Sequence, residues 1–388
     1  MTSRFIPALL LLLCGAGALA QDARSIHEKA IVVDTHGDIL SDQISSGIDL
    51  GKRQKGGNFD LVRAREGGLD VQVFSIWCDE RHGFDRAMQE IDSLESLIKR
   101  HPSKIALATN AAELQSAVKG GRLAAMIGVE GGHMIENSLD KLDELARRGM
   151  IYMTLTWNNS TPWATSAADE TRKTGLPNKG LGEQGKKIIS RMNELGIMVD
   201  LSHVGEATFY DALKASTKPV IASHSSAYAL NPHSRNLKDE QLKAIARNGG
   251  VVFVNFYSGF LDSTYSKKQA AFLKRHAEEM ARLTKEYDSK YKAESVLAVK
   301  YKDEVESMRA PLSLLVAHID HMVQVMGEDH VGLGADYDGA ESYPVHLDDV
   351  TGYPALTEAL LKKGYSAKRI EKILGGNFIR VLKANKGK

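Results

Sequence analysis

Six residues that can bind a metal ion or move a proton occupy similar places along the chain, because each comes at the end of a short apolar run. The runs and their last residues are "AIVVDTHGD" with His36 and Asp38, "LAAMIGVE" with Glu130, "GIMVDLSH" with His203, "KPVIASH" with His224 and "HVGLGAD" with Asp336. Imidazoles and carboxylates together are the ligands of divalent transition metals, and zinc above all.

The spacing of these residues indicates how they would share metal ions. His36 and Asp38 are two residues apart on a strand, so both side chains point to the same side. A catalytic zinc needs about three protein ligands and a water. Five ligands are generous for one metal and adequate for two if a carboxylate bridges them, and Glu130 is the natural bridge.

Eight apolar runs alternate with helix-like segments, and this alternation predicts the fold that would bring the six residues together. The runs are 30–36, 70–77, 123–130, 150–157, 196–203, 218–224, 249–257 and 330–336. They are rich in Val, Ile, Leu and Thr without strict alternation, as strands covered on both faces are. Segments 84–100 and 181–196 between them have apolar residues at helical spacing.

The pattern predicts a closed (β/α)8 barrel, the TIM barrel, in one domain spanning residues 21–388. The carboxyl ends of all barrel strands meet at one face, so residues far apart in sequence would converge there. A doubly wound open sheet is the competing fold. It is disfavoured because "GLGAD" carries two glycines without the rest of a dinucleotide-binding fingerprint.

One segment interrupts the alternation. Residues 262–310 are highly charged, with apolar residues at helical spacing, which predicts one or two long helices inserted after the seventh strand. Two interpretations stay open for this insertion: a solvated helical excursion, or a lid or homodimer-forming element.

The N-terminus has the layout of a secretory signal peptide. In "MTSRFIPALLLLLCGAGALAQDA", Arg4 precedes an apolar run that ends in an A-x-A cleavage site at Ala20. We expect residues 1–20 to be removed and the mature protein to be periplasmic or secreted. Lipid attachment at Cys14 is the alternative, but Leu13 is too large for the usual lipoprotein signal.

Composition excludes several classes of partner. The formal net charge is +1, so nothing favours nucleic acid or an anionic membrane as a partner. The polar C-terminus "IRVLKANKGK" excludes a hydrophobic anchor, and no stable membrane anchor is expected. After loss of Cys14 the remaining Cys78 cannot form an internal disulfide and is interpreted as a small buried residue.

The zinc signature HEXXH and the nucleophile motif G-x-S-x-G are both absent. The sequence nevertheless resembles the membrane (renal) dipeptidase family of the metal-dependent amidohydrolases, and in particular an exported bacterial member. The matching pieces are, in order, "DTHGD", "GVEGGH", "TLTWN…TPW", "DLSH", "SHSSAYAL" followed by "SRN", "VNFY", "GLGADYDG" and "GGNFIRVL". They cover nearly the whole mature chain.

The resemblance implies a binuclear zinc enzyme that hydrolyses dipeptides by a metal-bridging hydroxide. His36 and Asp38 would bind one Zn2+, His203 and His224 the other, and Glu130 both. Two further roles follow from the resemblance. Asp336 would be the acid/base, and Arg235 would hold the terminal carboxylate of the substrate.

Trp157 departs from the family pattern, which commonly has a substrate-contacting His at the end of the fourth strand. An indole donates one hydrogen bond but takes up no proton. Trp157 is therefore expected to shape the substrate site, as a donor or as a pocket wall. Two rival functions stay open: another amidohydrolase reaction, such as hydrolysis of an N-acyl amino acid or a cyclic amide, and a non-catalytic metal-binding protein.

Overall fold

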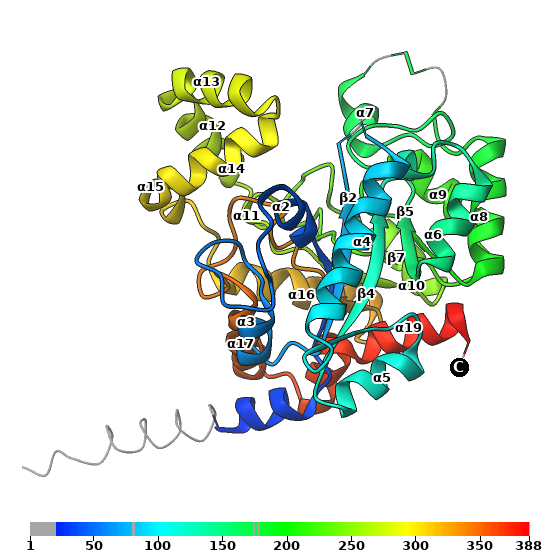
Figure 1. Ribbon diagram of the computed structural model, residues 1–388, viewed down its shortest axis with the longest axis horizontal. Helices are drawn as coiled ribbons and strands as arrows, with labels where there is room; N and C mark the ends of the chain where they lie inside the picture. Colours follow the sequence, from blue (N-terminus) through cyan, green and yellow to red (C-terminus); the bar gives the residue numbers. More distant parts are fainter. Residues whose placement is uncertain (1–20, 80–81, 174, 177–178, 388) are drawn as a thin grey trace, which may run out of the picture.

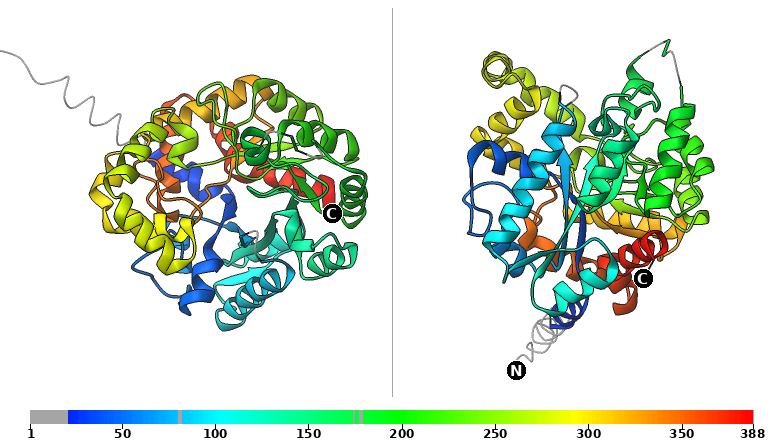
Figure 2. Two further views of the ribbon diagram at one scale, coloured as in Figure 1. Left: turned by 90° about the horizontal axis from the view of Figure 1, so that it is seen from above. Right: turned by 45° about the vertical axis from the view of Figure 1, so that its right-hand side comes forward.

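The computed structural model describes residues 21–387 except 80–81, 174 and 177–178. Parallel strands form a ring in the order β1-β2-β4-β5-β6-β7-β8-β9, and helices surround it (Figures 1 and 2). The strands are β1 Val33–Gly37, β2 Val71–Trp77, β4 Leu123–Glu130, β5 Met150–Thr154, β6 Met198–Asp200, β7 Ile221–Ala222, β8 Val251–Val254 and β9 Val331–Leu333. Each coincides with one of the eight apolar runs, β1 extending one residue beyond its run, so the predicted barrel is confirmed.

The first and last strands close the ring just beyond their carboxyl ends. Gly37 and Tyr337 form a parallel bridge, and the Asp38 amide donates to the Tyr337 carbonyl at 2.8 Å. The Asp336 amide donates to the His36 carbonyl at 3.0 Å. These bonds place two candidate site residues from opposite ends of the sequence side by side.

A ninth strand, β3 Ile105–Leu107, pairs with β4 outside the ring. The sequence analysis did not anticipate it. Three residues are too short a run to show a strand pattern, and two of them, Ala106 and Leu107, are only partly buried.

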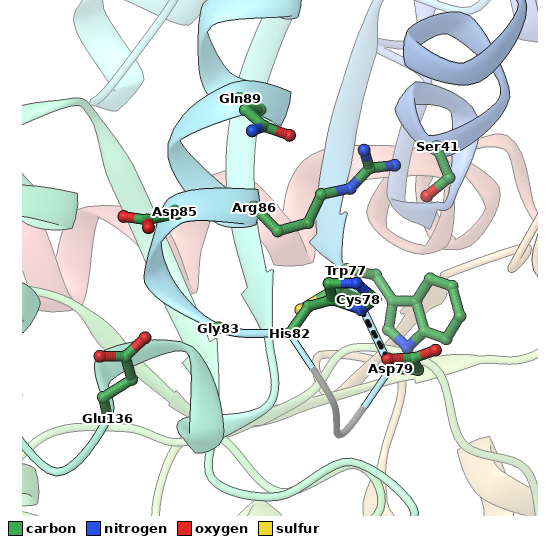
Figure 3. Close-up of a pocket in the computed structure, with 10 residues that line it drawn as sticks. All are labelled: Ser41, Trp77, Cys78, Asp79, His82, Gly83, Asp85, Arg86, Gln89 and Glu136. Carbon is green, nitrogen blue, oxygen red and sulfur yellow. Dashed lines mark hydrogen bonds and ion pairs between the residues drawn. The ribbon is translucent and has the colours of Figure 1, made fainter.

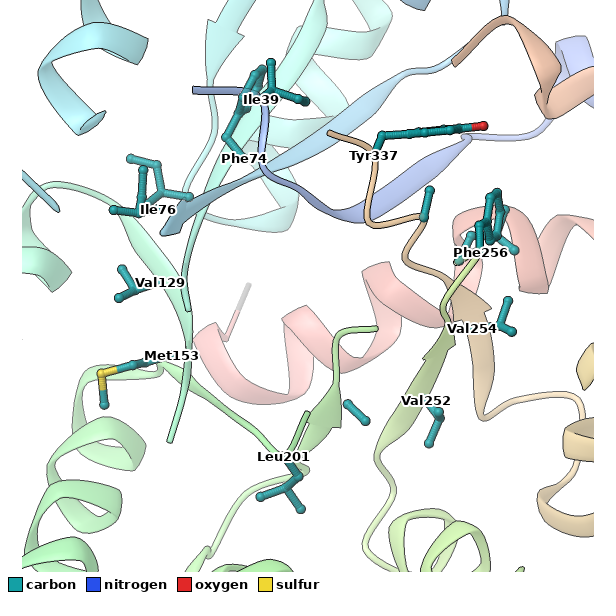
Figure 4. Close-up of a cluster of buried hydrophobic side chains, with 14 of the residues drawn as sticks. Ile39, Phe74, Ile76, Val129, Met153, Leu201, Val252, Val254, Phe256 and Tyr337 are labelled. Atoms are coloured by element: carbon teal, nitrogen blue, oxygen red, sulfur yellow. The ribbon is translucent and has the colours of Figure 1, made fainter. Parts of the chain in front are cut away.

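The main apolar core lies between the strands and the helices, where alternate strand residues point outward. On β2, Phe74 and Ile76 pack in this outer layer (Figure 4), while Val71 and Val73 belong to a second cluster that also includes residues of the helices after β3 and β9. The covering helices are amphipathic, as helix α4 Phe84–Arg100 shows by burying Ala87, Ile91, Leu94 and Leu97 on one side.

The helices that follow β1 to β7 are α2 Ile39–Ser46, α3 Leu61–Glu66, α4, α5 Ala111–Lys119, α6 Leu139–Arg147, α7 Ala167–Arg172, α8 Glu183–Leu195, α9 Glu206–Ala215 and α10 Asp239–Arg247. After β8 come α11 Ser258–Leu261 and, following the insertion, α16 Leu312–Met326. After β9 come α17 Tyr353–Lys362, α18 Ala367–Glu371 and α19 Asn377–Lys386. None of the described helices is long and apolar enough to cross a membrane.

The insertion follows β8, the seventh strand of the ring, but it differs from the expected one or two long helices. It contains four short ones: α12 Tyr265–Arg275, α13 Ala277–Tyr287, α14 Lys290–Lys300 and α15 Lys302–Glu306. The chain turns at His276, Asp288 and Tyr301, and Asp288 adopts a left-handed conformation with φ of 47°. Figure 1 shows α12, α13 and α14 as a separate group at the upper left, clear of the helices around the ring.

Candidate active site

The six residues at the strand ends converge on one small space at the carboxyl face of the ring. His36 lies within β1 and Glu130 is the last residue of β4, whereas His203, His224 and Asp336 lie two or three residues beyond β6, β7 and β9. His36 Nε2 lies 3.6 Å from Glu130 Oε2 and 3.8 Å from Asp38 Oδ1. These three side chains form one half of the cluster.

Glu130 also reaches the other half of the cluster with its second oxygen. Glu130 Oε1 lies 2.8 Å from His203 Nε2 and 3.3 Å from His224 Nε2. The two imidazole Nε2 atoms are 3.0 Å apart. The two carboxylate oxygens of Glu130 therefore face different histidines, which is the arrangement that a bridging ligand requires.

A hydrogen bond to the Tyr152 hydroxyl places a proton on Nδ1 of His36. The Tyr152 hydroxyl donates to the Thr35 carbonyl at 2.9 Å, so its oxygen accepts from His36 Nδ1–H, also at 2.9 Å. Because the proton sits on Nδ1, the Nε2 lone pair of His36 points toward Glu130 and Asp38. This is how metal-binding histidines are usually held.

The other two histidines are held in the same way by different partners. The Ser223 hydroxyl donates to Asp200 Oδ2 at 2.6 Å and accepts from His224 Nδ1–H at 2.8 Å. Asn158 Oδ1 accepts from His203 Nδ1–H at 3.2 Å. Each of the three imidazoles thus turns its Nε2 to the centre of the cluster, where a metal would bind it.

Three buried atoms without hydrogen-bond partners in the described structure, all in the first half of the cluster, indicate that these side chains suit a cation. His36 Nε2, Asp38 Oδ1 and Glu130 Oε2 are buried and have no hydrogen-bond partner among the described residues. A buried carboxylate without a donor is costly. Two overlapping groups bring three donor atoms within 4.8 Å of one another and could hold a divalent cation: His36, Glu130 and His224, and His36, Asp38 and Asp336.

The electrostatics of the cluster indicate a deficit of positive charge. Burial lowers the pKa of the His36 imidazole, but the carboxylates of Glu130, Asp38 and Asp336 outweigh burial and raise this pKa to about 10. Burial and the neighbouring Glu130 raise the pKa of the Asp38 carboxyl well above its usual value. Both pKa shifts show that a positive charge placed among these carboxylates would stabilise them.

The second half of the cluster favours neutral imidazoles. Burial, aided by the Arg235 charge, lowers the pKa of His203 to about 4. Burial and the nearby His36 lower the pKa of His224 well below its ordinary value. Neutral imidazole is the form that binds a metal.

Asp336 occupies the edge of the first half. Its Oδ2 accepts from Asn255 Nδ2 at 2.9 Å, and burial raises the pKa of its carboxyl. A Cβ atom at Gly339 would collide with the carboxylates of Asp336 and Asp38, so only glycine lets the chain pass there. Asp336 and His203 both adopt left-handed backbone conformations, with φ of 64° and 65°, which are uncommon for residues other than glycine.

Arg235 is buried beside this cluster without an anionic partner. Its Nη2 donates to the His224 carbonyl at 3.4 Å, its guanidinium lies 5.4 Å from the Phe260 ring, and its Nε has no partner among the described residues. Burial lowers the pKa of Arg235 to about 10, so the side chain is charged at neutral pH. The described residues form no ion pair with it, which leaves the guanidinium able to bind an external carboxylate.

Trp157 lies three residues beyond β5 and is buried next to His203, with the two ring centroids 6.4 Å apart. It also packs edge-on against Trp77, the last residue of β2. A cavity of about 600 Å3 adjoins Trp77 and contains none of the six clustered residues in its described lining (Figure 3). The lining is Ser41, Trp77, Cys78, Asp79, His82, Gly83, Asp85, Arg86, Gln89 and Glu136.

Sequence reasoning missed the residues that orient the histidines. No role is assigned from the sequence to Tyr152, Asn158, Ser223 or Asn255. The available signal was a polar residue inside or directly after a buried strand, as at Asp200 in "MVD". Such a residue must find buried partners, but sequence alone does not say which.

Comparisons with known proteins identify relatives of this chain. The sequence model of the family described as membrane dipeptidase (peptidase family M19) matches residues 20–387. An uncharacterised dipeptidase of Schizosaccharomyces pombe is 33% identical over 94% of this chain and 82% of its own.

Solved structures show the same fold. A dipeptidase described as a metallo peptidase of family M19 is 26% identical, with a TM-score of 0.77 over 93% of this chain and 100% of its own. A metallo peptidase from Rhodobacter sphaeroides, solved with a phosphinate mimic of the dipeptide L-Ala-D-Ala, is 26% identical, with a TM-score of 0.75 over 92% of this chain and 100% of its own.

Proposed function

The chain belongs to the membrane dipeptidase family (peptidase family M19), and from this premise we propose that it is a binuclear zinc dipeptidase acting on dipeptides with a free C-terminal carboxylate. The family confirms the predicted resemblance and the prediction of a peptidase. The metal identity, the number of metal ions and the residue roles are our proposal.

The observation that carries the proposal is the division of the cluster by Glu130. We assign one zinc to His36, Asp38 and Glu130, and the second to His203, His224 and Glu130. The support is the lone-pair orientation of the three imidazoles and the unpaired oxygens of Asp38 and Glu130. The relatives described as metallo peptidases are consistent with a metal here.

When bound, such a pair of cations supplies a water nucleophile of lowered pKa and a Lewis acid for the scissile carbonyl. A side chain of the protein transfers the proton. Asp336, held by Asn255 Nδ2, takes a proton from the nucleophilic water at its carboxylate and delivers it to the departing amide nitrogen. The C–O bond forms first by addition of the water oxygen to the carbonyl carbon, and the C–N bond then breaks as the nitrogen receives the proton, giving one carboxylate and one amine.

Arg235 gives the proposed substrate its class. A buried guanidinium with no anionic partner among the described residues suits the terminal carboxylate of a dipeptide, which it can bind through two parallel hydrogen bonds. A longer peptide carries its carboxylate farther from the scissile bond, so the contact favours dipeptides over proteins.

The test is a substrate panel with the zinc-loaded enzyme. It contains small L,L and L,D dipeptides, the matching dipeptide amides and N-acetyl amino acids. Hydrolysis of free-acid dipeptides in preference to the other two classes is expected. Preferential hydrolysis of N-acetyl amino acids would replace the proposal with another amidohydrolase activity, and zinc binding without turnover would make the protein a metal-binding protein.

Export also belongs to the proposal. Its support is the sequence of residues 1–20, which lie outside the described residues. N-terminal sequencing of the protein from the periplasm or medium should give Gln21 as the first residue, whereas a lipid-modified Cys14 would contradict it.

A further inference from the structure

The helical insertion is fixed against the loops of the candidate site. It has an apolar core of its own, composed of Tyr265, Phe272, Leu283, Ala293, Leu297, Ala298, Val305 and Met308. Glu341, five residues after Asp336, accepts hydrogen bonds from the Tyr257 and Tyr265 hydroxyls at 2.7 and 2.9 Å and from Gln269 Nε2 at 2.7 Å. Helix α12 is thereby tied to the loop that carries Asp336.

A row of three aromatic rings joins the insertion to the cluster. Tyr291, on α14, packs edge-on against Trp157 with ring centroids 5.3 Å apart, and Trp157 packs edge-on against Trp77 at 5.1 Å. The same Trp157 ring lies 6.4 Å from the ring of His203. The row therefore begins at β2, passes the candidate metal site and ends in the insertion.

The members of this row differ in exposure. Trp157 is 8% exposed, whereas Tyr291 is 51% exposed. Asn158 Nδ2 also donates a long hydrogen bond, of 3.4 Å, to the Tyr291 hydroxyl, but the ring is placed by its packing against Trp157. A half-exposed aromatic ring held next to a buried one offers an apolar surface for a ligand.

We propose that Tyr291 is a specificity-determining residue supplied by the insertion. Together with Trp157 and Trp77 it forms a surface on which an apolar or aromatic side chain of the substrate's amino-terminal residue packs. The inference rests on the proposed dipeptidase function and adds the class of dipeptide: those with a large apolar first residue.

The assignment to the first residue follows from the order of the strands. Trp77 ends β2 and Trp157 follows β5, and these two strands flank β4 and its Glu130, whereas Arg235 follows β7. A dipeptide whose carboxylate binds Arg235 and whose peptide bond lies at the cluster directs its amino-terminal half away from β7. That half then meets the aromatic row.

The experiment compares kcat/KM for phenylalanyl-alanine, alanyl-phenylalanine and alanyl-alanine in the wild type and in two variants. Tyr291→Ala should lower kcat/KM for phenylalanyl-alanine about threefold to tenfold, the effect of losing one aromatic contact. The two substrates that begin with alanine should change much less. Tyr291→Phe keeps the ring and should behave as the wild type.

Tyr287→Ala is the matched control. Tyr287 ends α13, is 42% exposed and is not among the rings that contact Trp157 in the described structure. This variant should leave all three values unchanged.

The outcomes separate the inference from the function on which it rests. With an active wild type, no loss in Tyr291→Ala, an equal loss on all three substrates, or a loss confined to alanyl-phenylalanine would each overturn the inference and leave the dipeptidase in place. A zinc-loaded wild type that cleaves none of the dipeptides would instead remove the proposed function.

Discussion

The Nε2 atoms of His203 and His224 lie 3.0 Å apart although both rings carry their proton on the far nitrogen. Two lone pairs at this distance repel each other unless a positive charge lies between them. Glu130 Oε1 points at the same place, 2.8 and 3.3 Å from the two nitrogens. The protein therefore holds three electron-pair donors around one point, an arrangement that a bound cation stabilises.

Zinc content follows directly from this arrangement. Protein purified without chelator should contain two zinc equivalents, because Glu130 faces two separate sets of donors. Removing the metal should lower Tm, since the unpaired carboxylates lose their compensating charge and a ligand bound only to the folded state stabilises it. Elemental analysis and thermal melts check both points. Saturation at one equivalent under zinc excess would contradict the bridging role of Glu130.

Tyr152→Phe should weaken zinc binding about 10- to 100-fold, the usual effect of removing the partner that orients a histidine ligand. The variant lacks the oxygen that accepts from His36 Nδ1–H. Competition with a chromophoric chelator measures the affinity. Tyr365→Phe is the control, because it also removes a hydroxyl that donates a hydrogen bond, in this case to Asp320 Oδ1 at 3.1 Å, and its partners Asp320 and Arg369 lie outside the cluster. Equal effects in both variants would argue against a specific role of Tyr152.

Asp336→Asn should keep both metal ions and lower kcat by about 10²- to 10⁴-fold, the contribution typical of a positioned acid–base group. An asparagine is close in size and keeps a side-chain oxygen that can accept from Asn255 Nδ2, so the loop should stay in place. Zinc content is measured beside kcat. Loss of a zinc ion would make Asp336 a ligand, which its proximity to His36 and Asp38 permits.

Arg235→Ala should raise KM for free-acid dipeptides and have much less effect on the matching amides. A charge-assisted hydrogen bond contributes about 1.5–3 kcal/mol, which corresponds to roughly 10- to 150-fold in kcat/KM. Kinetics on matched acid and amide pairs give the answer. An equal loss on both substrates would show that Arg235 supports the fold or the histidines instead.

Glu90 should make the folded state less stable as pH rises. It is buried on α4 and accepts from the Trp77 amide at 2.8 Å, and burial raises the pKa of its carboxyl from 4.5 to about 8. Because the folded protein prefers the neutral acid, this contribution to stability is complete below pH 4.5 and is lost progressively up to about pH 8. Glu90→Gln cannot ionise and should lose less Tm than the wild type between pH 5 and 8.

The control for Glu90 is Glu95→Gln on the same helix, where the side chain is 47% exposed. Its melts should follow the wild type at every pH. An identical pH dependence in Glu90→Gln and the wild type would show that this carboxyl does not titrate with folding.

The strands that could be predicted were those whose apolar runs are long and end in a polar residue. Glu130 closes eight buried residues, so both the strand and the placement of the carboxylate at its end could be read from the sequence. Strand β3 has three residues and gave no such signal.

The position of the insertion was predicted, but the number and length of its helices were not. The breaks at His276, Asp288 and Tyr301 contain neither glycine nor proline, so no turn residue marked them. Contacts between residues distant in the sequence could not be predicted either. Tyr152 contacts His36 and Tyr291 contacts Trp157, and each pair is more than 100 residues apart along the chain.

The closure of the ring through Gly37 and Tyr337 has a consequence for how the protein is made. A growing chain that stops before Val331 already contains His36, Asp38, Glu130, His203 and His224. It lacks β9 and the residues after it, which close the ring against the end of β1 and carry Asp336. The six-residue cluster can therefore assemble only when nearly nine-tenths of the polypeptide has been synthesised. Assembly of the proposed metal site is a late event in biosynthesis, and shortened chains should differ from the finished protein most clearly in their ability to retain metal.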